Sequence, residues 1–565
     1  MDARIIKGRT AIARKAQCSS LPLVLDMVHH NPGEAPFKTK WTNPRFLKRQ
    51  GFNGAIARLF VQCAVSHASV DPLIAPSASP IGTWIDRQAA LIDAALAESK
   101  SAGLPLYPLI DVLVVPKALL EKYGYQMETG GQIDIERHKT QEVIRAQITE
   151  IFGRFPDLEG LVVRFGETYL HDTPFHAGGR PMAREGESAI RGHVKLVQLL
   201  REEVCVRRDK RLFYRTWDFG SFHDRPDFYL SVTDRIEPHS NLFFSVKFQK
   251  GDFHRLSVFN PTIAIGRHRQ IIEVQCQAEA YGKGAHPYYI GKGAIEGWEE
   301  YAWTMKPGEA RGIRDVIRNP LIAGVWTWSR GGGWDGPNLS NELWCDVNTY
   351  VVSQFARHPE ETEAFLLETF SARVLGLRGA DVARFRKLCL LSADAVVRGQ
   401  LSFHGPVPVW WCRDQYIEVP DLSSLIRGGK TKEALDEKAE AVELWREIER
   451  LAREIDFKNP VRQEFASVST TYGRIKYAIF EQIWTLVILK GNYDGSGTCD
   501  FEKLGQSLVE YERLWSEWRA LKEVHESCSA LYLDIASPHS GAPAVKTLVR
   551  DCQSFARSRT STDRV

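Results

Sequence analysis

The chain has 565 residues, of which 44% are hydrophobic and 25% charged, a composition typical of soluble globular proteins. This length is too great for one compact core, so two or three domains are expected. Lysine and arginine (73 residues) nearly balance aspartate and glutamate (70 residues), so no global field favours nucleic acid or a membrane surface, and neither is predicted as a partner.

The first 20 residues carry basic side chains but no apolar core of signal-peptide length before Cys18. Residues 1–20 are therefore predicted to be an N-terminal extension, and no later apolar run has membrane-spanning length. The ten cysteines stand singly, without a CxxC pair or a Cys/His cluster at zinc spacing. These features predict a cytoplasmic protein with reduced thiols that needs neither a metal nor an organic cofactor.

Residues 21–348 alternate short apolar runs with amphipathic stretches. The strand candidates are Leu21–His29, Gly54–Val61, Leu104–Val115, Gly160–Phe165, Leu212–Trp217, Leu242–Phe248, Gln270–Ala278 and Ile322–Trp328. The helical patterns between them include Trp84–Ala102, Thr140–Phe155, Ala189–Arg208 and Ala294–Met305. Eight strand–helix units predict an α/β fold, a (β/α)8 TIM barrel with enlarged loops. A doubly wound open sheet is disfavoured because no Gly-rich phosphate fingerprint follows any strand.

Residues 349–553 change to long helical patterns and predict an all-α C-terminal domain. The predicted helices begin at Pro359 and cover Lys432–Ile455, Val461–Lys490 and Asp500–Leu533. An aromatic loop with Trp410 and Trp411 interrupts them, because its prolines prevent continuous helix. The loop either docks on the barrel with a buried tryptophan or contacts substrate. Residues 554–565 are predicted to be a disordered tail.

Polar and aromatic residues follow nearly every predicted strand, whereas the N-terminal ends of the strands carry no such clusters. In a barrel the C-terminal ends of the strands meet at one rim, where active sites lie. The seventh strand alternates Glu273, Gln275, Gln277 and Glu279 with apolar residues. An edge strand with a solvated face is the alternative for this segment alone. The rim as a whole predicts an enzyme.

Three acids follow predicted strands at positions suited to the cleavage of a glycosidic bond: Glu167, Asp252 and Glu279. That reaction needs one carboxylic acid at the leaving oxygen and one carboxylate across the sugar ring. A lone glutamate after a strand is usually a solvated loop residue, but three acids on one rim favour chemistry. Glu273 lies deeper and is expected to pair with a base such as Arg58 or Arg215. Asp111 is expected to lie inside its strand.

Basic side chains alternate with these acids: Arg164, Arg215 and Lys247 stand on the fourth, fifth and sixth strands. They either neutralise the acids or bind a carboxylate on the substrate, since Arg offers a planar fork and Lys a point charge. A hydrolase of neutral sugars would need fewer of them. The residues therefore predict an acidic sugar as the substrate.

Three stretches resemble the α-glucuronidases of glycoside hydrolase family 67. Ser245–Phe253 keeps the separation of the Lys and Asp on the family's sixth strand, Glu273–Gly282 resembles its seventh strand, and Arg164–Glu167 stands where the family has Lys and Glu. A helical domain follows the barrel in that family too. The chain departs from the family in lacking its N-terminal β-rich domain, and the eighth strand keeps only a Trp-x-Gly pattern.

The resemblance implies Glu167 as the general acid, with Asp252 and Glu279 as the two carboxylates that position and activate an inverting water. It also implies Lys247, Arg215 and Arg164 as partners of a uronic carboxylate. The aromatic residues Trp217, Tyr281 and Trp328 are further expected to contact the substrate.

Taken together, the chain is predicted to be an exo-acting, inverting glycoside hydrolase of polysaccharide degradation. It would release a terminal α-linked glucuronic acid, its 4-O-methyl ether or a related uronic acid from an acidic oligosaccharide. The helical domain would complete the substrate pocket, form a homodimer interface, or do both. Two alternatives remain: a barrel glycosidase that acts on a hexosaminide or neutral glycoside, and a non-catalytic barrel that binds carbohydrate or a protein partner.

Overall fold

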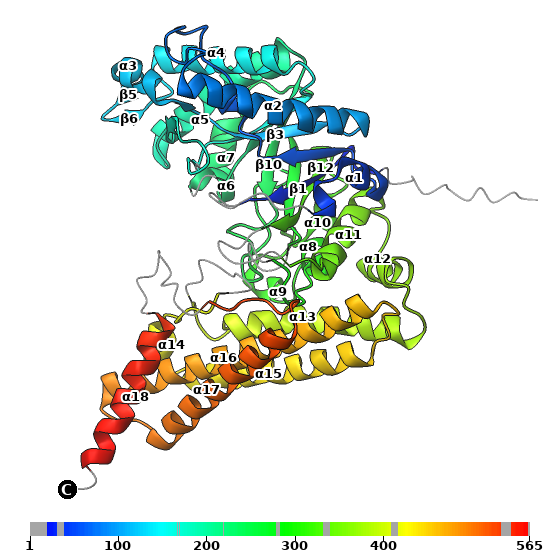
Figure 1. The fold of residues 1–565 in the computed structure, drawn as a ribbon, viewed down its shortest axis with the longest axis vertical. Coiled ribbons are helices and arrows are strands. Elements are labelled where there is room, and N and C mark those ends of the chain that lie inside the picture. The colour runs from blue at the N-terminus through cyan, green and yellow to red at the C-terminus, as the bar shows by residue number, and fades with distance from the viewer. Residues whose placement is uncertain are drawn as a thin grey trace, which may run out of the picture.

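The computed structural model describes residues 20–30, 39–166, 168, 170–217, 220–277, 283–331, 339–407, 416–532 and 544–562. Within these residues, eight parallel strands close into a barrel in the order β1–β12–β11–β10–β9–β7–β3–β2 (Figure 1). Their bounds are β1 Leu23–His29, β2 Gly54–Ala57, β3 Leu106–Asp111, β7 Gly160–Arg164, β9 Arg211–Arg215, β10 Leu242–Lys247, β11 Arg269–Gln275 and β12 Ile322–Gly331. The predicted (β/α)8 barrel and all eight predicted strands are confirmed. Ala278, the predicted end of the seventh strand, lies outside the described residues.

The third predicted strand, Leu104–Val115, is divided in two. Leu113 adopts a left-handed backbone conformation with φ 63°, which ends the extended chain after β3. The continuation, β4 (Val114–Pro116), pairs antiparallel with β8 (His176–Gly178) outside the barrel. The prediction that Asp111 lies inside a strand is therefore wrong, because Asp111 is the last residue of β3 and stands at the C-terminal rim.

Helices surround the barrel, and most of the stretches predicted to be helical are helices in the structure. Their bounds are α1 Pro44–Gln50, α2 Pro80–Ser101, α3 Lys117–Met127, α4 His138–Arg154, α5 Gly186–Leu200 with a π-helical extension Arg201–Val206, α6 Ser221–Asp224, α7 Pro226–Thr233, α8 Gly291–Glu296, α9 Tyr301–Thr304, α10 Ile313–Val316 and α11 Leu343–Arg357. The predicted helix Ala294–Met305 is two short helices. Gly297 separates them with φ 84°, and a Cβ there would collide with the backbone of Arg311.

The predicted all-α C-terminal region is confirmed, and its longest helices pack alongside one another (Figure 1). Its helices are α12 Glu363–Thr369, α13 Ala380–Gln400, α14 Ser423–Arg427, α15 Thr431–Glu454, α16 Pro460–Ser496, α17 Phe501–Val524 and α18 Val545–Thr562. The helix predicted from Pro359 begins later because the Thr362 side chain caps it. Helix α18 enters the segment 554–565 that was predicted to be disordered. The Trp410–Trp411 loop lies outside the described residues.

One hydrophobic cluster extends from the barrel into the helical region, whereas a second cluster, with residues of β3, β7 and β9, belongs to the barrel alone. The expected boundary at residue 348 falls inside α11, which packs against β12 of the barrel. From α11, the Trp344 indole nitrogen donates a hydrogen bond to Ser469 Oγ of α16 at 3.0 Å. Buried residues of β12 and of α16 belong to the same hydrophobic cluster. No helix among the described residues combines the length and apolar character needed to cross a membrane.

Candidate active site

The predicted site residues gather at the C-terminal rim of the barrel, as far as the structure describes them. Glu167, Glu279 and Tyr281 lie outside the described residues. Five of the remaining predicted residues end or follow β7, β9 and β10: Arg164, Arg215, Trp217, Lys247 and Asp252. The sixth, Trp328, lies inside β12, three residues before the end of that strand. Because these strands are parallel, their C-terminal ends open on the same face of the barrel.

Lys247 and Asp252 form an ion pair at this rim. Lys247 is the last residue of β10, its side chain is fully buried, and its Nζ lies 2.7 Å from Asp252 Oδ1. The same ammonium lies 3.5 Å from the centre of the Trp217 ring and 4.7 Å from that of Phe253. An ammonium at this distance favours the ionised form of the carboxyl group. Asp252 is therefore suited to accept a proton rather than to donate one.

Arg215 and Glu273 form a bidentate pair inside the barrel. Arg215 Nε lies 2.9 Å from Glu273 Oε1, and Nη2 lies 2.8 Å from Oε2. Ser245 Oγ donates a further hydrogen bond of 2.8 Å to Oε1. This confirms the expectation that Glu273 pairs with a base. It also commits two nitrogens of Arg215 to a protein carboxylate, so contact with a substrate uronate stays a prediction for this residue.

Arg164 has a partner that the sequence did not indicate. Its Nε lies 2.6 Å from Asp111 Oδ1, and both side chains are buried. The sequence analysis placed Asp111 inside its strand because the apolar residues after it, as far as Val115, resemble a continuing strand. The turn at Leu113 is what places the Asp111 carboxylate at the rim.

His29, at the end of β1, stacks on Trp328 with 5.1 Å between the ring centres. Burial and the positive charges of Arg164, Arg58 and Arg215 hold the pKa of His29 well below its ordinary value. The imidazole is therefore neutral and lies in a positively charged environment. Nothing in the sequence distinguished His29 from a structural histidine.

Trp328 belongs to the wall of the site. Its exposed fraction is only 2%, and the Phe253 ring lies edge-on at 5.3 Å between centres. The guanidinium of Arg215 lies 5.3 Å from its ring centre, which is within the range of a cation–π contact. Little of this indole is exposed, and its contact with a substrate stays a prediction.

The rim therefore combines cations and acids in matched pairs. Arg58 also has an acidic neighbour, with 3.6 Å between its Nη2 and Asp172 Oδ2. Just beyond β11, among the described residues, the fully buried Gln277 amide has no hydrogen-bond partner for its nitrogen or its oxygen. Such a group is suited to a ligand hydroxyl. Within the described part of the chain, no cluster of His, Cys, Asp and Glu side chains is arranged to hold a metal ion.

The carboxyl group of Asp26 supports the site from the outer face of the barrel. Asp26 of β1 accepts hydrogen bonds from Thr327 Oγ1 at 2.6 Å and Ser329 Oγ at 2.7 Å. These two residues flank Trp328 in β12. The register between β1 and β12 shifts at this point, so that Ser329 forms a bulge. Asp26 thus holds the backbone on both sides of Trp328.

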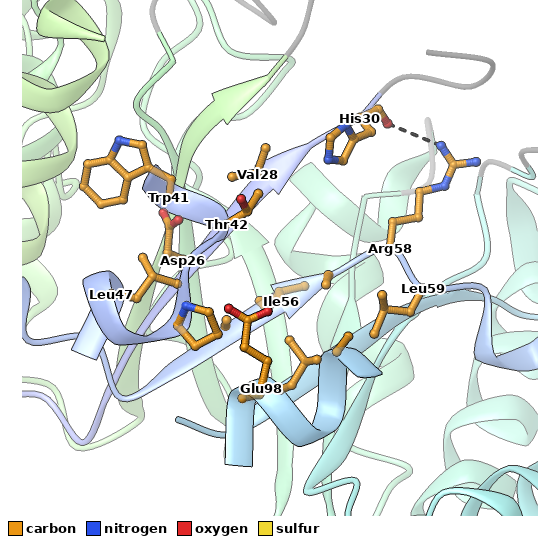
Figure 2. A pocket seen from close by; sticks show the side chains of 16 residues that line it. Asp26, Val28, His30, Trp41, Thr42, Leu47, Ile56, Arg58, Leu59 and Glu98 are labelled. Carbon is orange, nitrogen blue, oxygen red and sulfur yellow. Dashed lines mark hydrogen bonds between the residues drawn. The ribbon is translucent and has the colours of Figure 1, made fainter. Parts of the chain in front are cut away.

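Asp26 also borders a cavity of about 290 Å³ between β1 and β2 and the helices α1 and α2. Figure 2 shows its carboxyl group near Trp41 and Leu47, whereas His30 and Arg58 lie at the other end of the cavity. Burial raises the pKa of Asp26 to about 7, against the hydrogen bonds from Thr327 and Ser329, which lower it. The carboxyl group is therefore protonated in mildly acidic solution.

Replacing Asp26 with Asn is expected to remove a pH-dependent part of the stability. Because the pKa in the folded protein, about 7, is higher than the ordinary value of 3.8, the folded state binds more protons between these two values. The free energy of unfolding should then fall by roughly 4 kcal/mol as the pH rises from 4 to 7, and level off above 7.

Urea unfolding at several pH values in this range measures the difference between wild type and Asp26→Asn. That difference should change with pH, because Asn cannot ionise. Ser329→Ala is the matched control, since it removes a hydrogen bond to Asp26 but no titrating group. Parallel curves for wild type and Asp26→Asn would show that Asp26 does not titrate in this range.

No family model and no curated protein matches the chain. Among solved structures, it is similar to a GH138 enzyme targeting pectin rhamnogalacturonan II, with a TM-score of 0.59 and 11% identity over 97% of this chain and 84% of that one. A Thermobaculum terrenum O-GlcNAc hydrolase mutant gives a TM-score of 0.40 and 8% identity over 96% and 95% of the two chains. A family 89 glycoside hydrolase from Clostridium perfringens gives 0.46 and 11% over 84% and 51%. Of these three, only the GH138 enzyme has a TM-score above 0.5. That likeness is one of fold to a glycoside hydrolase barrel, and not to family 67 specifically.

Proposed function

We propose that the protein is a glycoside hydrolase that removes a terminal α-linked uronic acid from an oligosaccharide. The observation that supports this most is the set of cations on three neighbouring strands: Arg164 on β7, Arg215 on β9 and Lys247 on β10. They lie at the rim where TIM-barrel enzymes carry out their chemistry. The low pKa of His29 is caused first by its burial, and the positive charges of Arg164, Arg58 and Arg215 lower it further. A substrate with a carboxylate would be attracted to this rim.

In the proposed reaction, one water attacks the anomeric carbon as the glycosidic C–O bond breaks. The Asp252 carboxylate, held ionised by Lys247, takes the proton of that water. Glu167, assigned from the sequence, gives its proton to the leaving oxygen, and Glu279 helps to orient the water. Inversion requires the acid and the base to lie about 6.5–9.5 Å apart, which leaves room for the water.

A second candidate is a hydrolase of a hexosaminide or a neutral glycoside. It is favoured by the fact that Arg164, Arg215 and Lys247 each already contact a protein carboxylate. A uronate would have to share these cations with Asp111, Glu273 and Asp252, whereas a neutral sugar needs no such exchange. The same carboxylates would then serve a different sugar.

The deciding experiment is a panel of short glycans tested with wild type and Glu167→Gln. The panel should contain glucuronoxylan fragments, uronate-capped hexose oligomers and pectic fragments, with neutral and N-acetylated glycosides beside them. Proton NMR would follow the anomer that forms first. We expect a β-configured uronic acid from the α-linked uronides, and its loss in Glu167→Gln. Cleavage of neutral or N-acetylated glycosides alone would support the second candidate instead.

Lys247→Met is expected to distinguish the two proposed activities when it is tested on a uronide and on the corresponding neutral glycoside. The change removes the charge but keeps an unbranched apolar chain against Trp217. If Lys247 binds the substrate carboxylate, kcat/KM for a uronide should fall about tenfold or more beyond the fall for the corresponding neutral glycoside, because a charged hydrogen bond is lost only with the uronide. An equal fall for both substrates would mean that Lys247 serves only Asp252.

A further inference from the structure

A hollow with two exposed aromatic side chains lies where the barrel meets the helical region. It has a volume of about 140 Å³, and its lining includes Arg255, Trp303, Asp394, Arg398 and Phe403. Figure 1 shows the two elements that form it, α9 of the barrel and α13 of the helical region, facing each other. The hollow is separate from the residues assigned above to the catalytic rim.

Trp303 is the most informative residue of this hollow, because 70% of it is exposed. Phe403, on the helical side, is 39% exposed, and the guanidinium of Arg398 lies 5.6 Å from its ring centre. A single exposed hydrophobic side chain is common on protein surfaces, but here two exposed aromatic rings lie beside the same recess. The two rings are contributed by different parts of the chain, so the recess exists only in the complete fold.

Fixed charged groups surround these rings. Arg255 is nearly buried and binds Glu300 through two contacts of 2.8 and 3.1 Å. It also holds Asp394, whose carboxylate remains about half exposed at the edge of the hollow. Arg255 is itself stacked 4.2 Å above the Trp298 ring. Arg398 forms an ion pair with Glu440 at 3.0 Å and stays about one third exposed, so Asp394 and Arg398 are two partly exposed charged groups beside the aromatic rings.

The hollow lies close to the loop that carries Asp252. Arg255 follows Asp252 by three residues, so their Cα atoms are separated by at most about 11 Å. Tyr301 of α9 donates a hydrogen bond of 2.7 Å to the carbonyl oxygen of Ser257 and so fastens α9 to the same loop. Asp252 and one wall of the hollow therefore belong to the same loop.

We propose that this hollow is a second sugar-binding site, a subsite for a pyranose ring on the far side of the cleaved bond. The proposal rests on the proposed function in that the ligand is an oligosaccharide. The Trp303 indole covers the apolar face of the ring, and Asp394 and Arg398 bind its hydroxyl groups. A hexopyranose has about twice as many non-hydrogen atoms as benzene, which a cavity of about 150 Å³ holds, so the sugar would lie against Trp303 with only part of its ring inside the hollow.

The test compares Trp303→Ala with Tyr125→Ala. Tyr125 is the matched control, because it is an aromatic residue of α3 with 79% exposure that lies far from the hollow. For uronate-capped tri- and tetrasaccharides, kcat/KM of Trp303→Ala should be about tenfold lower than that of Tyr125→Ala, the effect of one lost aromatic contact. For an aryl uronide with no sugar beyond the bond, the two variants should match wild type. Trp303→Phe should recover most of the loss.

Direct binding separates this proposal from the catalytic one. Calorimetric titration with glucuronoxylan and pectic oligosaccharides should give a Kd about tenfold higher for Trp303→Ala, whether or not the oligosaccharide is cleaved. Weaker binding without any cleavage would support the subsite and contradict the proposed function. Cleavage with equal efficiency by wild type and Trp303→Ala on long and short substrates would overturn the subsite alone. If Trp303→Ala binds glycans as tightly as wild type but has a smaller mass in solution, Trp303 belongs to an interface between protein chains. That result would also overturn the subsite.

Discussion

Asp252→Asn is expected to lower kcat/KM on the true substrate by about 10²–10⁴-fold while the protein stays folded. Asn has nearly the same shape as Asp but cannot take the proton of the attacking water. The loss should appear mainly in kcat, because the water reacts after the sugar is bound. The alkaline part of the pH profile should not recover activity, since no carboxylate is left to ionise at this position.

Asp71→Asn is the matched control for Asp252→Asn. Asp71 also pairs with a lysine, Lys122, but that lysine belongs to α3 on the outside of the barrel. This variant should keep the activity of wild type. A fall of less than tenfold in Asp252→Asn would show that Asp252 only anchors Lys247 and that another carboxylate, with Glu279 the first candidate, is the base.

The second large effect is expected on stability, at the Arg215–Glu273 pair. Both side chains are buried, and the attraction between their charges offsets the free-energy cost of removing each charge from water. Arg215→Met alone or Glu273→Leu alone should lower the free energy of unfolding by about 3–5 kcal/mol, because one buried charge is left without its partner. The double variant should lose much less than the sum of the two single losses.

Urea unfolding of wild type, both single variants and the double variant completes this cycle. An exposed pair, Arg235–Glu187, with 2.9 Å between the charged atoms, provides the control, and Glu187→Gln is expected to leave unfolding almost unchanged. Strictly additive losses in the buried cycle would contradict the pairing. Activity should fall in all three buried variants, since the pair lies beneath Trp328, so stability is the measurement that decides.

The sequence predicted the barrel because its strands and helices alternate with distinct hydrophobic periods. It predicted the rim because polar residues follow the strands there. Lys247 and Asp252 lie at the same part of the rim because only five positions separate them, but the sequence left open whether Lys247 neutralises an acid or binds a substrate. The types of side chain at the rim could therefore be predicted from the residues that follow each strand in the sequence.

The long-range partners were harder to predict. Arg164 and Asp111 are 53 positions apart, and their contact arises only when β3 and β7 pair in the closed barrel. The sequence did not place Asp111 at the rim, because the left-handed turn at Leu113 leaves no signature in an apolar run. The environment of His29 depends on charges from several strands, and no pattern along the chain encodes such a convergence.

The shared core of the barrel and the helical region has a consequence for the use of this protein. Trp344 lies on the last helix of the barrel, yet its neighbours Phe385 and Phe465 belong to α13 and α16. A shortened chain that ended after α11 would contain every strand of the barrel but would leave this indole and the surface around it in water. Large exposed apolar surfaces of that kind promote aggregation. The barrel is therefore expected to need the helical region for its solubility, and a fusion protein should contain both parts.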